Sequence, residues 1–412
     1  MRSAVTPGSN SETIRRDNLS MLLREVHLTG PRSRSDLVAR TGLNRSTVGD
    51  LVAELVDQGL VREQRGDSLG SPGRPSPTVH AAPEGAVVLA VSMAVHWLTV
   101  ALVGLGGHVL DRVRRDRAGA PPTLDQVLAD TLEMGRSMLQ RPGIRERLVG
   151  IGVAAVGPVR SQDGYVHFAP NLGWSSVPMA DRIARLFDLD VPVVVRNEAD
   201  LGARAEHLRG AGVGVDDLIY LSCDVGVGAG IVTGGRPLVG ARGYAGEVGH
   251  VAVVPDGATC GCGSHGCWET VVGERALLRG AGRDPDGGPR EVDAVLRAAE
   301  AGELGPMSAV LALGRWLGIG LSGLVNTFDP QVVVLGGLFG RLAPLVREPM
   351  DAELATRVMS VSRDPVRVVA SSLGDDAPLM GAAERAFEPL LADPVRWAPR
   401  PFALQGGAMA NV

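Results

Sequence analysis

Three of the chain's four cysteines fall within eight positions of one another, separated mostly by glycine. They are Cys260, Cys262 and Cys267. Glycine tolerates the backbone angles of a tight turn, so a C-x-C-x4-C run of this composition lets three thiolates converge on one point. Such convergence is typical of a metal site, and a tetrahedral zinc ion would then need one further ligand.

Two histidines could supply that ligand. His250 follows a glycine-containing turn upstream, whereas His265 lies inside the loop and would bind from the segment that it helps to close. We therefore favour His250 and predict a structural zinc site with no open coordination position. The competing interpretations are a disulfide, which cysteines two positions apart form poorly, and reduced buried thiols without a metal.

The residues around these ligands resemble a known family. The run AGEVGH at residues 245–250, followed by CGCGSHGCWE at 260–269, is similar to the signature of the ROK family, which contains sugar kinases and sugar-responsive repressors. The resemblance extends from about Gly85 to Pro389. It implies that His250, Cys260, Cys262 and Cys267 hold zinc, and that Glu247, His250 and Glu269 contact the hydroxyl groups of a bound sugar.

Other segments resemble the sugar side of the family's kinases. Residues 170–174 (PNLGW) are similar to its P-N-L-x-G-W loop, and residues 197–200 (NEAD) stand where the kinases have N-D-A-N. The kinase aspartate is the general base, and Glu198 replaces it here with a carboxylate displaced by one methylene. A simpler interpretation of Glu198 is a carboxylate favoured at a helix N-terminus. The predicted site for a sugar or sugar-phosphate effector comprises Gly157, Asn171, Asn197, Glu198, Glu247, His250 and Glu269.

The phosphate-binding side of the resemblance is altered. Kinases of the family carry D-x-G-G-T in the first hairpin, and the matching residues here are Ser92, Ala94, Val95 and His96. Their second loop is G-T-G-x-G, where this chain has Asp224 and Val225 before Gly226. Losing the metal-binding carboxylate and adding a charge beside the phosphates both oppose phosphoryl transfer. We expect no enzyme activity, with an active sugar kinase that carries a DNA-binding head as the alternative.

Residues 1–82 have the pattern of a winged helix-turn-helix. Apolar residues at 19, 22, 23 and 26 share one helix face, and Ser33 with Asp36 forms a capping pair for a second helix at 33–40. Asn44 is a good N-cap for a third helix, whose predicted inward residues are Val48, Leu51, Val52, Leu55 and Val56. Strands at 61–64 and 74–80 would form the wing. The alternative is a three-helix protein-interaction module.

The third helix would place its first turn in the DNA major groove, and Arg74, held extended by prolines, would enter a minor groove. Arg74 can also be an ordinary linker residue. Residues 1–80 hold 11 arginines and 9 acidic residues, net +2, while the rest of the chain carries −7, so a nucleic-acid contact is expected at the head. The predicted DNA contacts are Arg34, Asn44, Arg45, Ser46, Thr47 and Arg74.

At 412 residues the chain is long enough for two or three domains. The expected fold is α/β: a winged helix-turn-helix at 1–82 with 1–12 disordered, two lobes of an actin-like, hexokinase-type domain at 83–200 and 201–390, and a tail at 391–412. We find no signal peptide and no uncharged apolar run long enough for a membrane, which predicts a cytoplasmic protein. The expected partners are operator DNA and a second or further copies, as homodimer or homotetramer. A regulator that answers to a protein instead of a sugar is the third alternative.

Overall fold

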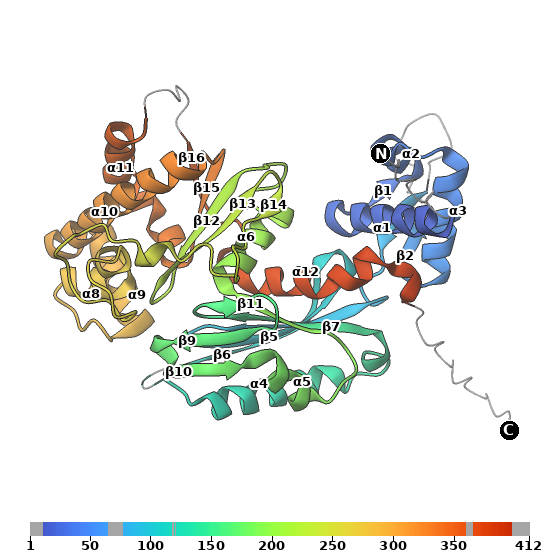
Figure 1. The fold of residues 1–412 in the computed structure, drawn as a ribbon, viewed down its shortest axis with the longest axis horizontal. Helices are drawn as coiled ribbons and strands as arrows, with labels where there is room; N and C mark the ends of the chain where they lie inside the picture. The colour runs from blue at the N-terminus through green and yellow to red at the C-terminus, as the bar shows by residue number, and fades with distance from the viewer. Residues whose placement is uncertain (1–10, 65–76, 118, 120, 360–365, 398–412) are drawn as a thin grey trace, which may run out of the picture.

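The computed structural model describes residues 11–64, 77–117, 119, 121–359 and 366–397. The chain begins with a small head of three helices and a three-stranded sheet, on the right in Figure 1. The predicted winged helix-turn-helix is confirmed. Its helices are α1 (Ser11–Thr29), α2 (Arg34–Thr41) and α3 (Arg45–Asp57), and its sheet has the order β1 (Arg32–Ser33), β3 (Thr78–Ala81), β2 (Val61–Gln64).

Short-range hydrogen bonds set the start of both short helices in the head. The Ser33 hydroxyl accepts from the Asp36 amide at 3.1 Å, and the Asp36 carboxylate accepts from the Ser33 amide at 3.2 Å. This is the reciprocal capping box that the sequence predicts. Asn44 caps α3 in one direction only, its side chain accepting from the Thr47 amide at 2.8 Å. The prediction that Val56 faces inward is wrong: it is 38% exposed, because one position beyond the buried Leu55 lies a quarter-turn away around the helix.

The first lobe, at the bottom of Figure 1, is built on a five-stranded sheet in the order β11-β7-β4-β5-β6. An antiparallel meander forms one half, and two parallel strands extend it. The strands are β4 (Val87–Met93), β5 (Trp97–Gly104), β6 (His108–Asp116), β7 (Leu148–Ala155) and β11 (Val193–Asn197), with helices α4 (Leu124–Leu139) and α5 (Met179–Phe187) and a small sheet of β8 (Val159–Arg160), β9 (Tyr165–Ala169) and β10 (Trp174–Pro178).

The second lobe repeats the same strand topology, with sheet order β14-β13-β12-β15-β16. Two lobes with one topology are the hallmark of the expected actin-like architecture. The elements are β12 (Leu218–Cys223), β13 (Val227–Thr233), β14 (Arg236–Pro237), β15 (Val332–Gly336) and β16 (Arg367–Ala370), with the helices α7 (Glu269–Val272), α8 (Glu274–Gly280), α9 (Gly288–Glu300), α10 (Leu304–Phe328) and α11 (Gly337–Arg357).

Two further helices, α6 (Glu198–Arg209) and α12 (Ala377–Ala392), lie between the lobes in the centre of Figure 1. Although α12 comes from the end of the described chain, it packs on the first lobe's strands β4 and β7. Bare glycines permit this close fit: a Cβ on Gly152 would lie 2.0 Å from the Ala382 carbonyl oxygen, and one on Gly381 would lie 1.9 Å from that of Leu201. From there α12 continues to the head.

Helix α10 bears on the sequence-based expectation that no apolar segment is long enough to cross a membrane. By length and composition, α10 is apolar enough to cross a membrane, which the search for an uncharged run missed because Arg315 interrupts it. In the folded chain 56% of its most apolar window is buried inside the protein.

Candidate functional site

The four predicted zinc ligands meet at one point. The ligand atoms of His250, Cys260, Cys262 and Cys267 all lie within 4.8 Å of one another. The Sγ atoms of Cys262 and Cys267 are 3.7 Å apart, and Cys260 Sγ is 3.7 Å from Nδ1 of His250. A tetrahedral zinc ion with sulfur ligands has edges of about 3.8 Å, so the donor set has the right chemistry and the right spacing.

The same geometry distinguishes the zinc site from its alternatives, which are His265 as the fourth ligand and a disulfide between cysteines. His265 is exposed and lies outside the cluster, with its Nδ1 3.3 Å from the Thr259 hydroxyl. All four cysteines, which lie in the described part of the chain, are free thiols. Burial raises the pKa of Cys260 to about 12 and also raises that of Cys267, so thiolates at this position need a neighbouring cation to compensate their charge.

The predicted sugar-site residues come from strand ends and helix starts that face one another. Asn197 ends β11 and caps α6, its amide nitrogen donating to the Gly157 carbonyl at 2.9 Å and its amide oxygen accepting from the Ala199 amide at 2.7 Å. Gly157 follows β7 with a φ of 82°, a backbone conformation that favours glycine. The parallel pairing of β11 with β7 therefore brings Gly157, Asn197 and Glu198 together.

The predicted zinc cluster lies next to the carboxylate of Glu247. His250 Nε2 lies 3.9 Å from Oε2 of Glu247, while its Nδ1 faces Cys260. Glu269, the first residue of α7, accepts from the Val227 amide at 3.0 Å. One imidazole can therefore serve both the metal cluster and the carboxylate side.

The side chains of Glu269 and Asn171 both lie close to Gly226, which has no side chain of its own. A Cβ built on Gly226 would lie 2.7 Å from a carboxylate oxygen of Glu269 and 3.9 Å from the side-chain nitrogen of Asn171. Arg275 also donates to Asn171, at 3.3 Å. Gly157 and Asn197 are thus in direct contact, Glu247 lies beside His250, and Glu269 and Asn171 both lie close to Gly226, while the charge of Glu247 acts on Glu198.

Crowded carboxylates give this site unusual protonation. Burial, with repulsion from Asp224 and Glu247, raises the pKa of Glu198 well above its usual range. Burial and Glu247 raise the pKa of Asp200 to about 7, against a partial opposing effect of Arg196. Buried polar groups at this density need a polar ligand or water to satisfy them.

The side that would face nucleotide phosphates is occupied by acidic groups and a histidine. His96 Nε2 lies 3.3 Å from Oε1 of Glu274 at the start of α8, so the first hairpin contacts the second lobe directly. Burial and Asp375 raise the pKa of Asp224 to about 6, although His96 lowers it. Neither the second carboxylate, Glu274, nor the His96 contact was foreseen from the sequence.

The predicted DNA contacts are distributed unevenly. Asn44, Arg45 and Ser46 are exposed at the start of α3, and Thr47 is partly exposed. Asn44 accepts from Ser46 Oγ at 2.7 Å and from the Thr47 amide at 2.8 Å, so its amide oxygen is engaged within the helix. Both carboxylate oxygens of Glu63 accept from Arg34, at 2.6 and 2.8 Å, and DNA contact by Arg34 would require that pair to open. Arg74 lies outside the described residues.

Sequence reasoning did not assign a role to Asp200 or to the pair of His167 and Tyr244. Asp200 lies within the NEAD run, and only the fold brings it near enough to Glu247 for that carboxylate to raise its pKa. The Tyr244 hydroxyl is hydrogen-bonded to Nε2 of His167, which joins the loop before Glu247 to strand β9. No local sequence signal pairs residues 77 positions apart.

Comparisons with known proteins agree with this architecture. A family model described as "ROK family" matches residues 88–388, and one described as "MarR family" matches residues 20–68. The xylose repressor of Bacillus subtilis (strain 168) is 30% identical over 379 residues, covering 92% of this chain and 97% of the relative. The glucokinase of Streptomyces coelicolor is 33% identical over 291 residues, 66% of this chain and 89% of that protein.

Among solved structures, too, a transcriptional regulator matches more of this chain than a kinase does. A ROK family transcriptional regulator, described as a homolog of the E. coli MLC protein, superposes with a TM-score of 0.74 at 27% identity, covering 92% of this chain and 97% of that one. A ROK family glucokinase from Streptomyces griseus, in complex with glucose and AMPPNP, has a TM-score of 0.64 at 29% identity and covers 73% of this chain and 99% of its own. The repressor-type relatives therefore match nearly the whole chain, while these kinases match about two thirds to three quarters of it. With its family model matching well over half of its length, the chain belongs to the ROK family.

Proposed function

We propose that this protein is a cytoplasmic transcriptional repressor whose DNA binding changes when its ROK domain binds a sugar. The observation that carries the proposal is the union, in one chain, of a winged helix-turn-helix with a cluster of polar side chains that has Asp224 where the kinases of the family have a phosphate-binding loop. The full-length relatives are named repressors, and the kinases match the ROK part alone.

Glu247, Glu269, Asn197 and Glu198 are the hydroxyl-binding groups in this proposal. Carboxylates accept from sugar hydroxyls, and a protonated Glu198 could also donate. Asn171 would add an amide, while Gly157 leaves its carbonyl to orient Asn197. Because xylose repressors are similar to this chain over nearly its whole length, D-xylose is the first ligand to test.

Zinc is the cofactor that fits the cluster of His250, Cys260, Cys262 and Cys267. When bound, it would hold the knuckle closed and fix His250 beside Glu247, with no coordination position left for a reactive water. In that arrangement the metal supports the sugar pocket and takes no part in a reaction.

The head would read DNA through the first turn of α3 and the wing. A helix-turn-helix usually reads two half-sites through a two-fold oligomer, so a homodimer or homotetramer is part of the proposal. We propose the domain limits 1–82, 83–200 and 201–390 with a tail at 391–412, while helix α12 (Ala377–Ala392) packs on the strands of the first lobe although it follows the second lobe in sequence and extends into the tail.

Calorimetry of the full-length protein with D-xylose, and with D-glucose as the second probe, tests the sugar arm. Binding is expected, and Glu247→Ala should abolish it because the pocket loses a hydroxyl acceptor. Glu300→Gln, an exposed glutamate at the end of α9, is the matched control and should bind normally. A normal titration by Glu247→Ala would contradict this assignment.

The DNA arm uses a duplex that the protein selects from a random-sequence pool. Sugar should change its affinity, and Arg45→Ala should cost about 1–3 kcal/mol on that duplex, as expected for a lost base contact. Arg315→Ala, on the distant helix α10, is the control. Equal DNA affinity of the Arg45 variant and the wild type would remove α3 from the proposed interface.

A further inference from the structure

Helix α6 connects the predicted sugar site to the head. Its first residue is Glu198, capped by Asn197, and its last residue is Arg209. Twelve helical residues span about 18 Å. The two ends of one rigid element therefore lie in two different sites.

At the far end of α6, Arg209 enters a buried polar junction with the head. Its Nε donates to Oε1 of Glu384 at 2.6 Å, its Nη1 donates to the Gly106 carbonyl at 3.1 Å, and its Nη2 donates to the carbonyl of His27 at 3.2 Å. His27 belongs to α1 and is fully enclosed, as is Glu384 on α12. One guanidinium thus contacts the head, α12 and the first lobe.

The His27 ring is fixed from both sides. Its Nδ1 accepts from the Gly106 amide at 3.0 Å, and its Nε2 lies 3.1 Å from the Glu384 carboxylate and 2.9 Å from Nη2 of Arg209. The ring also packs edge-on against Phe387, with ring centres 5.1 Å apart. Although burial opposes ionisation, His27 and Arg209 lower the pKa of Glu384 to about 2, so the junction keeps a charged carboxylate.

A second set of ion pairs repeats this arrangement one turn away. Glu388 of α12 accepts from Arg24 of α1 at 3.1 and 3.2 Å and also pairs with Arg204 of α6. The Ser20 hydroxyl donates to the Leu391 carbonyl at 2.6 Å. Charged side chains of α6 and α12 thus join both helices to α1 of the head. A shift of either helix relative to α1 would disturb these ion pairs and hydrogen bonds.

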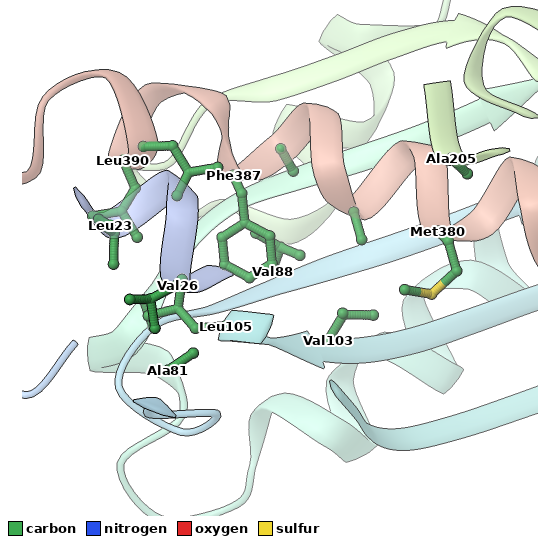
Figure 2. Close-up of a cluster of buried hydrophobic side chains, with 14 of the residues drawn as sticks. Leu23, Val26, Ala81, Val88, Val103, Leu105, Ala205, Met380, Phe387 and Leu390 are labelled. Carbon is green, nitrogen blue, oxygen red and sulfur yellow. The ribbon is translucent and has the colours of Figure 1, made fainter. Parts of the chain in front are cut away.

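Buried apolar side chains also connect the head to the ROK domain at this junction. Figure 2 shows Leu23 and Val26 of the head beside Phe387, Leu390 and Leu105, and the same buried cluster extends to Ala205 of α6 and Met380 of α12. This cluster also contains the buried residues of α3 (Val48, Leu51, Val52, Leu55). The head is therefore packed onto the ROK domain as part of one core, and the recognition helix rests on α1.

We propose that α6 transmits sugar occupancy to the DNA-binding head, through Arg209 and Arg204 acting on α1. The inference rests on the proposed function and names how that site is regulated. Sugar contacts at Asn197 and Glu198 bias the position of the helix, and the buried, close-packed junction passes that displacement to α1 and α3. Packed interfaces of this kind change between discrete arrangements instead of deforming smoothly.

The test compares Arg209→Met, Arg204→Met and Arg24→Met with the wild-type chain. DNA affinity for the selected duplex is measured with and without whichever of D-xylose and D-glucose gives binding heat. We expect the wild-type affinity to change at least about five-fold, a typical coupling between sites. In the variants the change should fall below two-fold while the sugar dissociation constant, from calorimetry, stays within three-fold.

Two controls make the result specific. Arg315→Met breaks an exposed ion pair with Glu353 on the far helices, and Arg15→Met breaks a pair with Glu54 inside the head. Both should keep the full sugar response. Amide hydrogen exchange of α1 gives a second readout: sugar should alter it in the wild type but not in Arg209→Met.

Because removing one partner of a buried ion pair destabilises a fold, Arg24→Met provides the milder variant, with a side chain that is 34% exposed in the wild type. A folded variant of any of the three that keeps the full response overturns the proposal. A wild-type chain that binds neither sugar, or whose DNA affinity is indifferent to the bound sugar, would instead overturn the proposed function and this inference with it.

Discussion

At the scale of single residues, the site is a concentration of carboxylates that cannot all be ionised together. Glu198, Asp200, Asp224 and Glu247 each have a raised pKa, and each is raised first by burial. A site prepared for hydroxyl groups would hold such acceptors close together and partly shielded from water, at a cost to stability. The effect should appear as a dependence of stability on pH.

Replacing Asp200 by Asn should stabilise the sugar-free protein at pH 8 by about 1–2 kcal/mol, less than the full shift allows because the side chain is partly exposed. The pKa of Asp200 is raised from 3.8 to about 7, so the folded protein retains a proton that the unfolded chain releases. Stability from this group is therefore present at low pH and is lost as pH rises from about 4 through 7.

Thermal unfolding at pH 5 and pH 8 measures this effect. The advantage of Asp200→Asn should be clearly smaller at pH 5 than at pH 8, because only part of the titration between pH 4 and 7 has occurred at pH 5. Asp190→Asn, an exposed aspartate before β11, should leave the difference between the two pH values unchanged. An advantage that is equal at both pH values would show that Asp200 does not titrate in this range.

At the scale of elements, the metal knuckle has little backbone support of its own. Between His250 and Cys267 the chain forms isolated bridges, such as Thr259 with His265, and a few turn bonds, such as the Cys260 amide to the Ser264 carbonyl at 2.7 Å. A segment without regular structure needs side-chain links to stay in place. The cysteines are the residues able to provide them.

Cys262→Ser should therefore reduce bound zinc from near one per chain to well below it, and lower stability by about 2 kcal/mol or more. Sugar affinity should fall as a consequence, since His250 loses its fixed position beside Glu247. Cys223→Ala, which changes a cysteine outside the cluster, should keep its zinc. Metal analysis of the purified proteins decides the question: a wild-type chain without zinc would contradict the assignment.

Local signals explain why so many elements were predictable. The capping pair of Ser33 and Asp36 and the Asn44 cap depend only on neighbours in sequence, and they appear where expected. The residues of the predicted site were likewise proposed from short sequence runs. The packing of α12 on β4 and β7, the contact of His96 with Glu274 and the environment of Asp200 depend on residues far apart in the chain, and no local pattern encodes them.

At the scale of the whole molecule, the two lobes retain the kinase architecture while the phosphate side has become acidic. Asp375 and Glu274 each lie close enough to Asp224 to raise its pKa, and the chain beyond the head carries a net charge of −7. Phosphoryl transfer depends on neutralising charge at that position. The fold alone therefore does not imply the reaction.

We accordingly expect no ATP binding by calorimetry at millimolar nucleotide, and no ADP release above an enzyme-free control when ATP, Mg²⁺ and D-xylose or D-glucose are supplied. The physical reason is that phosphates would face ionised carboxylates with no compensating residue at Ser92, whose hydroxyl replaces the carboxylate of the kinases. The Streptomyces coelicolor glucokinase serves as the positive control, with sugar and nucleotide at the same concentrations. Sugar-dependent ADP release by the wild-type chain that disappears in Glu198→Gln would reverse the assignment, because it would show that Glu198 still acts as the base of an active kinase.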